Sequence, residues 1–238
     1  MSIVFRQFFH DESASLSYLL ADALTGHAVL IDPVCEQAGL YLSALQELEL
    51  DLVWLLATHF HAGDSSGTQA LQEHTAARTA GAEATGTNAV DHAVGHGDTL
   101  VFGNEVIRVI ATPGHTTNSV TYKWRDRIFT GDALLIGGCG RTDFPGGNPA
   151  DLYDSLTQRL LALPDETMVF PGHDYRGLRV SSIAQEKLTN TKVCGRSRNE
   201  FVGLMTSLPH PTPASPDSAT TPTGRCARTG TLIDIHAA

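Results

Sequence analysis

Four apolar segments of this chain each lead into a side chain that can bind a metal, and this repeated pattern restricts the possible fold more than any other feature. The segments and the polar residues that follow them are 53–57 with His59 and His61, 106–111 with His115, 128–130 with Asp132, and 168–170 with His173. Short apolar runs of this kind predict buried strands, and loops at strand ends are where a rigid sheet presents functional groups. We therefore expect the four polar segments to meet at one edge of a layered sheet structure.

In three of the four segments a glycine directly precedes the polar residue: Gly114, Gly131 and Gly172. Because glycine has no Cβ, it permits a tight turn that directs the next side chain back over the end of the sheet. Imidazole and carboxylate groups that converge on one edge form a ligand set for a divalent transition metal. A single histidine at a strand end is more often a hydrogen-bonded core or surface residue. The prediction of a metal site therefore depends on the repetition of the pattern.

Hydrophobic periodicity predicts the elements around these strands. Residues 17–20 and 28–31 are expected to form a hairpin that turns at 25–27. Segment 36–50 has leucines at three-residue spacing, which is typical of one face of a surface helix. A second helix is predicted to start near Asn148, with proline at its first position. Helices that alternate with strands favour a layered α/β domain.

Composition excludes several classes of protein. The 238 residues include 42% hydrophobic and 18% charged residues, as in soluble globular proteins. The formal net charge of −10 excludes a general nucleic-acid or anionic-membrane binder, since either needs a basic surface. No apolar run approaches the ~20 residues that span a bilayer, and the N-terminus lacks the pattern of a signal peptide. We expect a cytoplasmic protein whose four widely spaced cysteines are reduced.

The composition changes after Leu208. Residues 209–238 are rich in Pro, Ser and Thr, which is typical of an extended or loosely packed segment. The sequence therefore predicts one domain over residues 1–208 and a C-terminal tail over residues 209–238.

Six motifs carry a resemblance to a known family. They are Phe5-Arg6-Gln7, Thr58-His59-Phe60-His61, Thr112-Pro113-Gly114-His115-Thr116, the run FTGDALLI at 129–136, the run GCGRTDF at 138–144, and Pro171-Gly172-His173-Asp174-Tyr175. On these motifs the chain resembles the metallo-β-lactamase superfamily and, within it, the persulfide dioxygenases, also called sulfur dioxygenases. The first histidine motif is superfamily-wide, whereas GCGRTDF and the HDY triplet resemble a narrower subgroup. The resemblance implies a four-layered αββα sandwich.

The same resemblance implies one Fe(II) per chain, held by His59, His115 and Asp132. Two histidines and one carboxylate leave about three coordination positions open, as expected of oxygen-activating iron. The implied activity is the oxidation of glutathione persulfide by O2 to sulfite and glutathione. The implied partners are therefore glutathione persulfide and O2, and a homodimer is left open.

Three further side chains are candidates for substrate binding. The guanidinium of Arg141 can hold a carboxylate of glutathione in a bidentate way, and the alternative is a structural ion pair with Asp143 or another carboxylate. Tyr175 resembles the family tyrosine near the iron, whose hydroxyl can hydrogen-bond a bound oxygen species, and it is our catalytic candidate. The alternative for Tyr175 is a tyrosine at the edge of the core. Arg176 is a weaker candidate, with a surface charge as its alternative.

One departure from the superfamily pattern bears on the function. The superfamily motif is H-x-H-x-D-H, and this chain has Gly63 in place of the Asp and Asp64 in place of the last His. In the binuclear hydrolases these two positions bind the second metal, so their loss argues against a metal-paired hydroxide. We therefore expect His61, His173 and Asp64 to contact the metal ligands or to be vestigial. The alternative is that a shift of the loop brings Asp64 to the metal.

Two other functions stay open. One is a binuclear zinc thioester hydrolase resembling glyoxalase II, which two zinc ions per chain would favour. The other is a weakened relative that binds a thiol ligand, which the change at positions 63 and 64 keeps possible.

Overall fold

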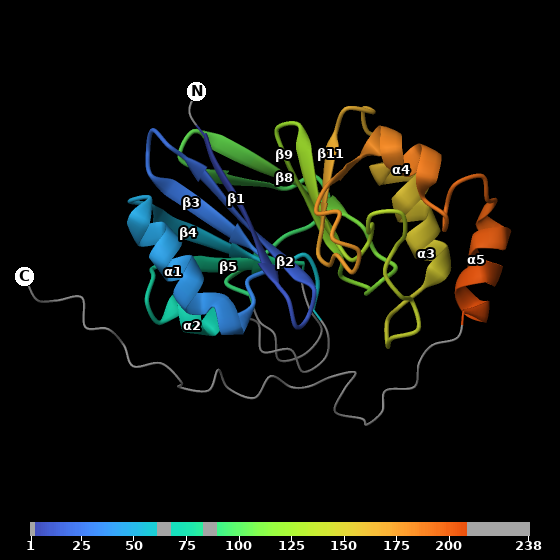
Figure 1. Ribbon diagram of the computed structural model, residues 1–238, viewed down its shortest axis with the longest axis horizontal. Coiled ribbons are helices and arrows are strands. Elements are labelled where there is room, and N and C mark those ends of the chain that lie inside the picture. Colours follow the sequence, from blue (N-terminus) through green and yellow to red (C-terminus); the bar gives the residue numbers. More distant parts are fainter. Residues whose placement is uncertain (1–2, 61–67, 83–89, 209–238) are drawn as a thin grey trace, which may run out of the picture.

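Two six-stranded sheets lie face to face in the computed structural model, which describes residues 3–60, 68–82 and 90–208. Helices cover the outer side of each sheet (Figure 1). This arrangement is the four-layered αββα sandwich that the sequence predicts. None of the helices within the described residues is long and apolar enough to cross a membrane.

The first sheet has the strand order β1-β2-β3-β4-β5-β6. Its strands are β1 (Ile3–His10), β2 (Ser15–Asp22), β3 (His27–Ile31), β4 (Asp51–Leu56), β5 (Arg78–Gly81) and β6 (His92–Ala93). Strands β1, β2 and β3 are antiparallel neighbours, and β3 to β6 run parallel. The short helix η1 (Cys35–Gln37) leads into α1 (Ala38–Glu47), and α1 and α2 (Thr68–Gln72) lie on the outer side of this sheet (Figure 1).

The second sheet has the order β12-β11-β10-β9-β8-β7. Its strands are β7 (Thr99–Phe102), β8 (Glu105–Ala111), β9 (Val120–Trp124), β10 (Arg127–Gly131), β11 (Met168–Pro171) and β12 (Ser181–Ser182). The helices on its outer side are α3 (Pro149–Asp154), the π-helical continuation η2 (Ser155–Leu160), α4 (Ile183–Thr189) and α5 (Arg198–Ser207). Strands β10 and β11 run parallel, so the loops that follow them leave the same edge of the sheet.

The core has three apolar layers, one between the two sheets and one between each sheet and its helices. In β2, Tyr18 packs between the two sheets and Leu19 packs against the α1 side. In β10, Phe129 points between the sheets and Ile128 points toward α3 and α4. Because side chains alternate along a strand, strands that are covered on both faces must be apolar at every position. Each fully buried large side chain contributes roughly 1.5–3 kcal/mol to the free energy of unfolding.

Most of the predicted elements are confirmed. The hairpin is formed by β2 and β3, and segment 36–50 contains α1. Helix α3 begins at Pro149, and the side chain of Asn148 caps it by accepting hydrogen bonds from two backbone N–H groups. The strand β1 is not among the sequence predictions. The tail at 209–238 lies outside the described residues, so the domain limits stay a prediction.

The cysteines require one correction. Within the described residues, Cys139 and Cys194 are free thiols, as expected. Cys35, however, is disulfide-bonded, so the expectation of reduced thiols is wrong for this residue. The error arises because a disulfide depends on two distant residues meeting in space, and wide spacing in the sequence gives no information on that.

Candidate metal centre

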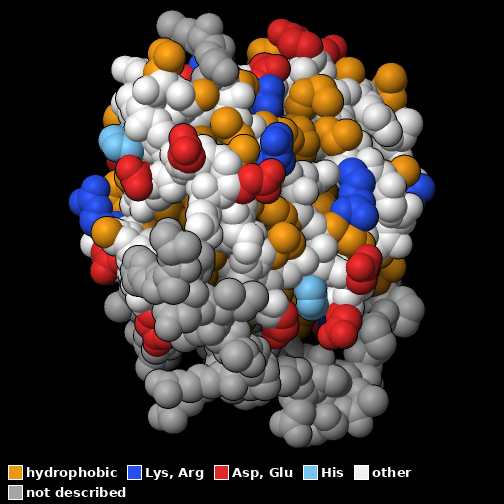
Figure 2. Space-filling view, turned by 60° about the vertical axis from the view of Figure 1, so that its left-hand side comes forward, with side chains coloured by type: hydrophobic (Ala, Val, Ile, Leu, Met, Phe, Trp, Pro, Cys, Tyr) orange, Lys and Arg blue, Asp and Glu red, His pale blue; other side chains and the backbone are white. Residues whose placement is uncertain are grey.

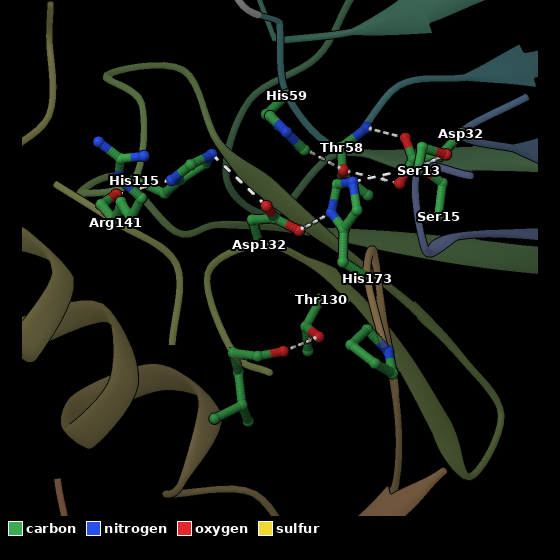
Figure 3. A network of polar contacts seen from close by, with 12 residues as sticks. Ser13, Ser15, Asp32, Thr58, His59, His115, Thr130, Asp132, Arg141 and His173 are labelled. Carbon is green, nitrogen blue, oxygen red and sulfur yellow. Dashed lines mark hydrogen bonds and ion pairs between the residues drawn. The ribbon is translucent and has the colours of Figure 1, made fainter. Parts of the chain in front are cut away.

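Three of the predicted ligands meet at one end of the sandwich. His59 follows β4 of the first sheet, and His115 and Asp132 follow β8 and β10 of the second. One ligand atom from each lies within 4.8 Å of the others (Figure 3). Donors bound to one ion at about 2.0–2.2 Å lie about 3–4 Å apart, so small side-chain rotations bring all three onto a single ion. Two imidazoles and one carboxylate are a donor set that suits Fe, Zn or a similar divalent ion.

Hydrogen bonds fix which atoms of His115 and Asp132 face this centre. Nδ1 of His115 donates to the carbonyl oxygen of Arg141 at 2.7 Å, and Nε2 then faces Oδ2 of Asp132 at 3.8 Å. Oδ1 of Asp132 accepts from Nδ1 of His173 at 2.6 Å (Figure 3). Such partners set the tautomer and the orientation of metal ligands. His173 therefore contacts a ligand in this structure, and its Nε2 lies 3.2 Å from the hydroxyl of Ser15.

His59 is oriented by a separate chain of hydrogen bonds. Its Nδ1 donates to Oγ1 of Thr58 at 2.9 Å, and that hydroxyl donates to Oδ2 of Asp32 at 2.8 Å. Oδ1 of Asp32 also accepts from the backbone N–H of Thr58 at 2.7 Å. Burial raises the pKa of Asp32 to about 6, although the two bonds from Thr58 act in the opposite direction.

The electrostatics of the centre favour a charged carboxylate. Burial by itself would raise the pKa of Asp132, but His173 and the two ligand histidines hold this pKa well below its ordinary value. Burial would lower the pKa of His173, and Asp132 outweighs that effect and raises it. Asp132 is thus ionised at neutral pH, as a metal ligand must be.

Close backbone approach at the centre requires glycine at several positions, among them Gly131 and Gly140. A Cβ on Gly131, which has φ of +51°, would lie 2.3 Å from Oγ1 of Thr58. A Cβ on Gly140 would lie 2.3 Å from the carbonyl oxygen of Asp132 and 2.9 Å from Nδ1 of His115. Distances this short exclude any side chain. The glycine pattern of the sequence predicts Gly131, but it does not single out Gly140.

A cleft of about 910 Å³ opens over the three ligands. Arg141 and Tyr175 both line this cleft, and the described residues that line it do not include Arg176. The backbone N–H of Arg176 donates to Asp174, and its Nη1 lies beside Gly137. This placement favours Arg141 and Tyr175 over Arg176 as substrate ligands.

Arg141 forms an ion pair and lines the cleft at the same time. Its Nε and Nη2 donate to the two carboxylate oxygens of Asp143 at 2.9 and 2.5 Å, and its guanidinium lies 4.8 Å from the ring centroid of Phe144. The fork is thus held by Asp143 on one edge. The Nη1 edge is the one that an incoming carboxylate can approach, because a guanidinium presents donors on more than one side.

Tyr175 is a surface residue of the cleft and not a residue at the edge of the core. Its side chain is stacked on His173, with ring centroids 5.8 Å apart and planes inclined by 3°, and the residue is 71% exposed. His61 and Asp64 lie outside the described residues, so their placement stays a prediction.

The sequence predictions missed two supporting residues. Asp32 follows the apolar strand β3 in the same way as the predicted ligands follow theirs, so the strand-end pattern itself could have indicated it. Gly140 gives no such signal, because its close contact with Asp132 depends on how the loop folds back.

The comparisons with known proteins agree with this geometry. Residues 10–173 match the family model described as Metallo-beta-lactamase superfamily. The persulfide dioxygenase ETHE1, mitochondrial, of Mus musculus is 38% identical over 232 residues, covering 94% of this chain and 89% of that protein. The crystal structure of ETHE1 from Myxococcus xanthus superposes with a TM-score of 0.83 at 49% identity, covering 87% of this chain and 93% of that one. A hydroxyacylglutathione hydrolase of Cereibacter sphaeroides is 36% identical over 167 residues, covering 68% of this chain and 64% of that protein.

An αββα sandwich with histidine and aspartate ligands at its strand ends defines the metallo-β-lactamase fold, and the family match covers most of the chain. The similarity to the mouse dioxygenase runs over nearly the whole length of both proteins, whereas the similarity to the hydrolase leaves about a third of that protein unmatched. The chain therefore belongs to the persulfide dioxygenase family of the metallo-β-lactamase superfamily.

Proposed function

We propose that this protein is a glutathione-persulfide dioxygenase that holds one Fe(II) through His59, His115 and Asp132. The observation that carries the proposal is the convergence of two imidazoles and one carboxylate from three strand ends. Family membership supports the dioxygenase reaction. Iron(II) in such a site supplies open coordination positions for O2 and the persulfide and the electrons that activate O2.

The proposed reaction balances without any further co-reactant. One glutathione persulfide, one O2 and one water give one glutathione, one sulfite and two protons. The bond between the two sulfur atoms breaks, the inner sulfur leaves as the thiol of glutathione, and the outer sulfur is oxidised by O2. Sulfite carries three oxygens, of which two balance O2 and one balances water.

The side chains of the cleft have separate roles in this proposal. Arg141 binds a carboxylate of glutathione through the edge that Asp143 leaves open. Tyr175 offers a hydroxyl at the cleft, where it can donate a hydrogen bond to the reacting group. His173 holds one oxygen of Asp132 and so keeps the other directed at the metal.

Metal analysis combined with oxygen uptake tests the proposal directly. Protein purified without oxygen should contain about one iron per chain, and it should consume O2 and form sulfite in equal amounts when glutathione persulfide is added. Two zinc ions per chain at full occupancy, with no oxygen uptake, would overturn it.

A thioester hydrolase remains the second candidate, because a hydroxyacylglutathione hydrolase shares 36% identity over 68% of this chain. Against it stand Gly63 and Asp64, where a second metal would need an aspartate and a histidine. The double substitution Gly63→Asp, Asp64→His should increase zinc uptake without producing efficient thioester hydrolysis, because the cleft around Arg141 is unchanged. In the oxygen-uptake experiment on the parent protein, binding of glutathione persulfide without any oxygen uptake would indicate a weakened thiol-binding relative.

The absence of a nucleic-acid partner stays a prediction from the net charge of −10. On the face drawn in Figure 2 the Lys and Arg side chains are scattered among acidic and apolar ones and form no continuous stripe. The cytoplasmic location stays a prediction from the sequence. The oligomeric state stays open, and gel filtration can determine whether the protein is a homodimer.

A further inference from the structure

The loop at residues 137–141 contacts two of the three metal ligands through its backbone. The N–H of Gly140 donates to the carbonyl oxygen of Asp132 at 2.8 Å, and the carbonyl oxygen of Arg141 accepts from Nδ1 of His115 at 2.7 Å. The same loop carries the Arg141 guanidinium into the cleft. A shift of this backbone therefore moves a metal ligand and a substrate ligand together.

A buried carboxylate on helix α4 holds the start of this loop. Glu186 is 0% exposed, and its Oε2 accepts hydrogen bonds from the N–H of Gly137 at 2.9 Å and from Nδ2 of Asn190 at 2.8 Å. Its Oε1 accepts from the hydroxyl of Ser181 at 2.6 Å. Within residues 3–60, 68–82 and 90–208, no Lys, Arg or His forms an ion pair with Glu186.

Asn190 ties the same helix to the next residue of the loop. It is also 0% exposed, and its Nδ2 donates to the carbonyl oxygen of Gly138 at 3.0 Å as well as to Glu186. Thr191 adds a weaker bond to the carbonyl oxygen of Gly137 at 3.3 Å. Three hydrogen bonds thus connect α4 and the two residues after it to Gly137 and Gly138.

A buried carboxylate is a costly way to join a helix to a sheet. Leu or Met would fill the same volume without the penalty of desolvating a charge. A carboxylate is needed where backbone and side-chain donors must be held at fixed positions, because both of its oxygens accept. Here those donors include the backbone N–H of Gly137, in the loop that supports the metal ligands. If packing α4 against its apolar neighbours were the only requirement, an apolar residue at position 186 would meet it.

We propose that Glu186, with Asn190, is a positioning residue that fixes the 137–141 loop and so sets both metal affinity and substrate binding. Glu186 touches neither the metal ligands nor the cleft, and it acts through Gly137 and the backbone of the loop. The part that concerns substrate binding rests on the proposed function. The part that concerns the metal depends only on the three ligands.

Two substitutions of Glu186 separate this role from a merely structural one. Glu186→Met keeps the volume and removes both acceptors, so the loop loses its anchor. We expect metal affinity to fall by ~10-fold or more, within the range typical of groups that support metal ligands. Glu186→Gln is the conservative variant, since its amide oxygen can accept from Gly137 and Asn190 and its NH2 can donate to Ser181. It should restore metal affinity to within about 2-fold of the parent.

Ile183→Ala is the matched control on the same helix. Ile183 is 0% exposed and packs in the core between the second sheet and its helices, and its side chain is apolar. Its truncation should lower the melting temperature by creating a cavity and leave metal affinity within about 2-fold of the parent. Asn190→Ala provides a second loop variant if Glu186→Met does not fold, with an expected loss of metal affinity of ~3-fold or more.

The measurements are titration of the metal-free protein with Fe(II) under anaerobic conditions, and amide hydrogen exchange of residues 137–141. Faster exchange in this loop and weaker metal binding in Glu186→Met, both reversed in Glu186→Gln, support the proposal. Unchanged metal affinity in both loop variants, or equal losses in Ile183→Ala, would overturn it. Neither readout needs dioxygenase activity, so a parent protein that consumes no O2 would refute the proposed function and leave this test intact. If the parent is active, KM for glutathione persulfide should rise in Glu186→Met more than kcat falls.

Discussion

The two sheets contribute unequally to the metal centre. The second sheet supplies His115 and Asp132, which are 2% and 9% exposed, and the first supplies His59, which is only partly buried. His115 and Asp132 are held by Arg141, Gly140 and His173, all from the C-terminal half of the chain. The second sheet therefore supplies what we call the platform, the two predicted ligands His115 and Asp132 with their shared supports, and the first sheet adds the third predicted ligand.

The difference lies in what each ligand depends on. His115 and Asp132 both contact the backbone of the 137–141 loop, so a change in this loop affects both of them. His59 depends on the independent chain through Thr58 to Asp32. We therefore expect substitutions that displace both His115 and Asp132 to remove the metal altogether, and substitutions in the hydrogen-bond chain from Thr58 to Asp32 to weaken metal binding without abolishing it.

The largest effect should come from Gly140→Ala. The new Cβ would lie 2.3 Å from the carbonyl oxygen of Asp132 and 2.9 Å from the ring of His115, so the platform must open. We expect metal binding to be lost as completely as in Asp132→Ala, although Gly140 offers no ligand atom. The control is Gly138→Ala, whose Cβ would meet nothing within 4 Å. Metal content after gel filtration measures the effect, and full metal content in Gly140→Ala would show that the platform is not rigid.

The next effect concerns the first sheet. Thr58→Val removes the hydroxyl that links His59 to Asp32 and keeps the shape of the side chain, so metal affinity should fall by ~10 to 100-fold. Thr58→Ser should restore most of it, because serine keeps the hydroxyl. Titration with Fe(II) measures both variants. A loss as complete as that of Asp132→Ala would mean that the two sheets do not differ in the way described.

A smaller effect is expected for the side chain of Arg141, because the contact of Arg141 with His115 is made by its backbone carbonyl, which a substitution retains. Arg141→Ala should raise KM for glutathione persulfide by ~10-fold and change kcat less, since it removes binding that ground and transition states share. Arg141→Lys should recover only part of this, because an ammonium lacks the planar fork. An unchanged KM together with a lower melting temperature would instead identify the pair with Asp143 as purely structural.

The smallest effect lies at Asp22, at the end of β2. The carboxylate of Asp22 accepts hydrogen bonds from the backbone N–H and the side-chain amide of Asn104. Asn104 lies in the turn between β7 and β8, so these bonds connect the first sheet to the second. The hydrogen bonds from Asn104 and Leu24 lower the pKa of Asp22 to about 2. Because this pKa lies below the unfolded value of about 3.9, the contribution of Asp22 to stability is complete above pH ~5 and is lost as the pH falls toward 2.

Asp22→Asn should therefore flatten the dependence of the melting temperature on pH between about 5 and 2. Metal affinity at neutral pH should stay unchanged, since Asp22 is not among the residues of the metal centre. If the melting temperature of Asp22→Asn falls between pH 5 and 2 as steeply as that of the parent, this contact between the sheets does not contribute to stability.

The sequence by itself predicted the strands of the candidate metal centre and the three side chains that meet there. Each of His59, His115 and Asp132 follows an apolar run, and both the run and the polar residue are local features that a pattern of a few residues records. The glycine before His115 and the glycine before Asp132 are local in the same sense, because a tight turn depends only on its own backbone.

Only the tertiary structure decided how these residues are supported. The hydrogen bond from His173 to Asp132 and the anchor that Glu186 gives to Gly137 join residues 41 and 49 positions apart. The Arg141 carbonyl that orients His115 gives no sequence signal at all, since every residue has a carbonyl group. Contacts of this kind arise when two sheets and their helices pack together, and the packing of the whole chain sets their geometry. A sequence pattern can therefore indicate the candidate ligands of this centre, but not the groups that hold them in place.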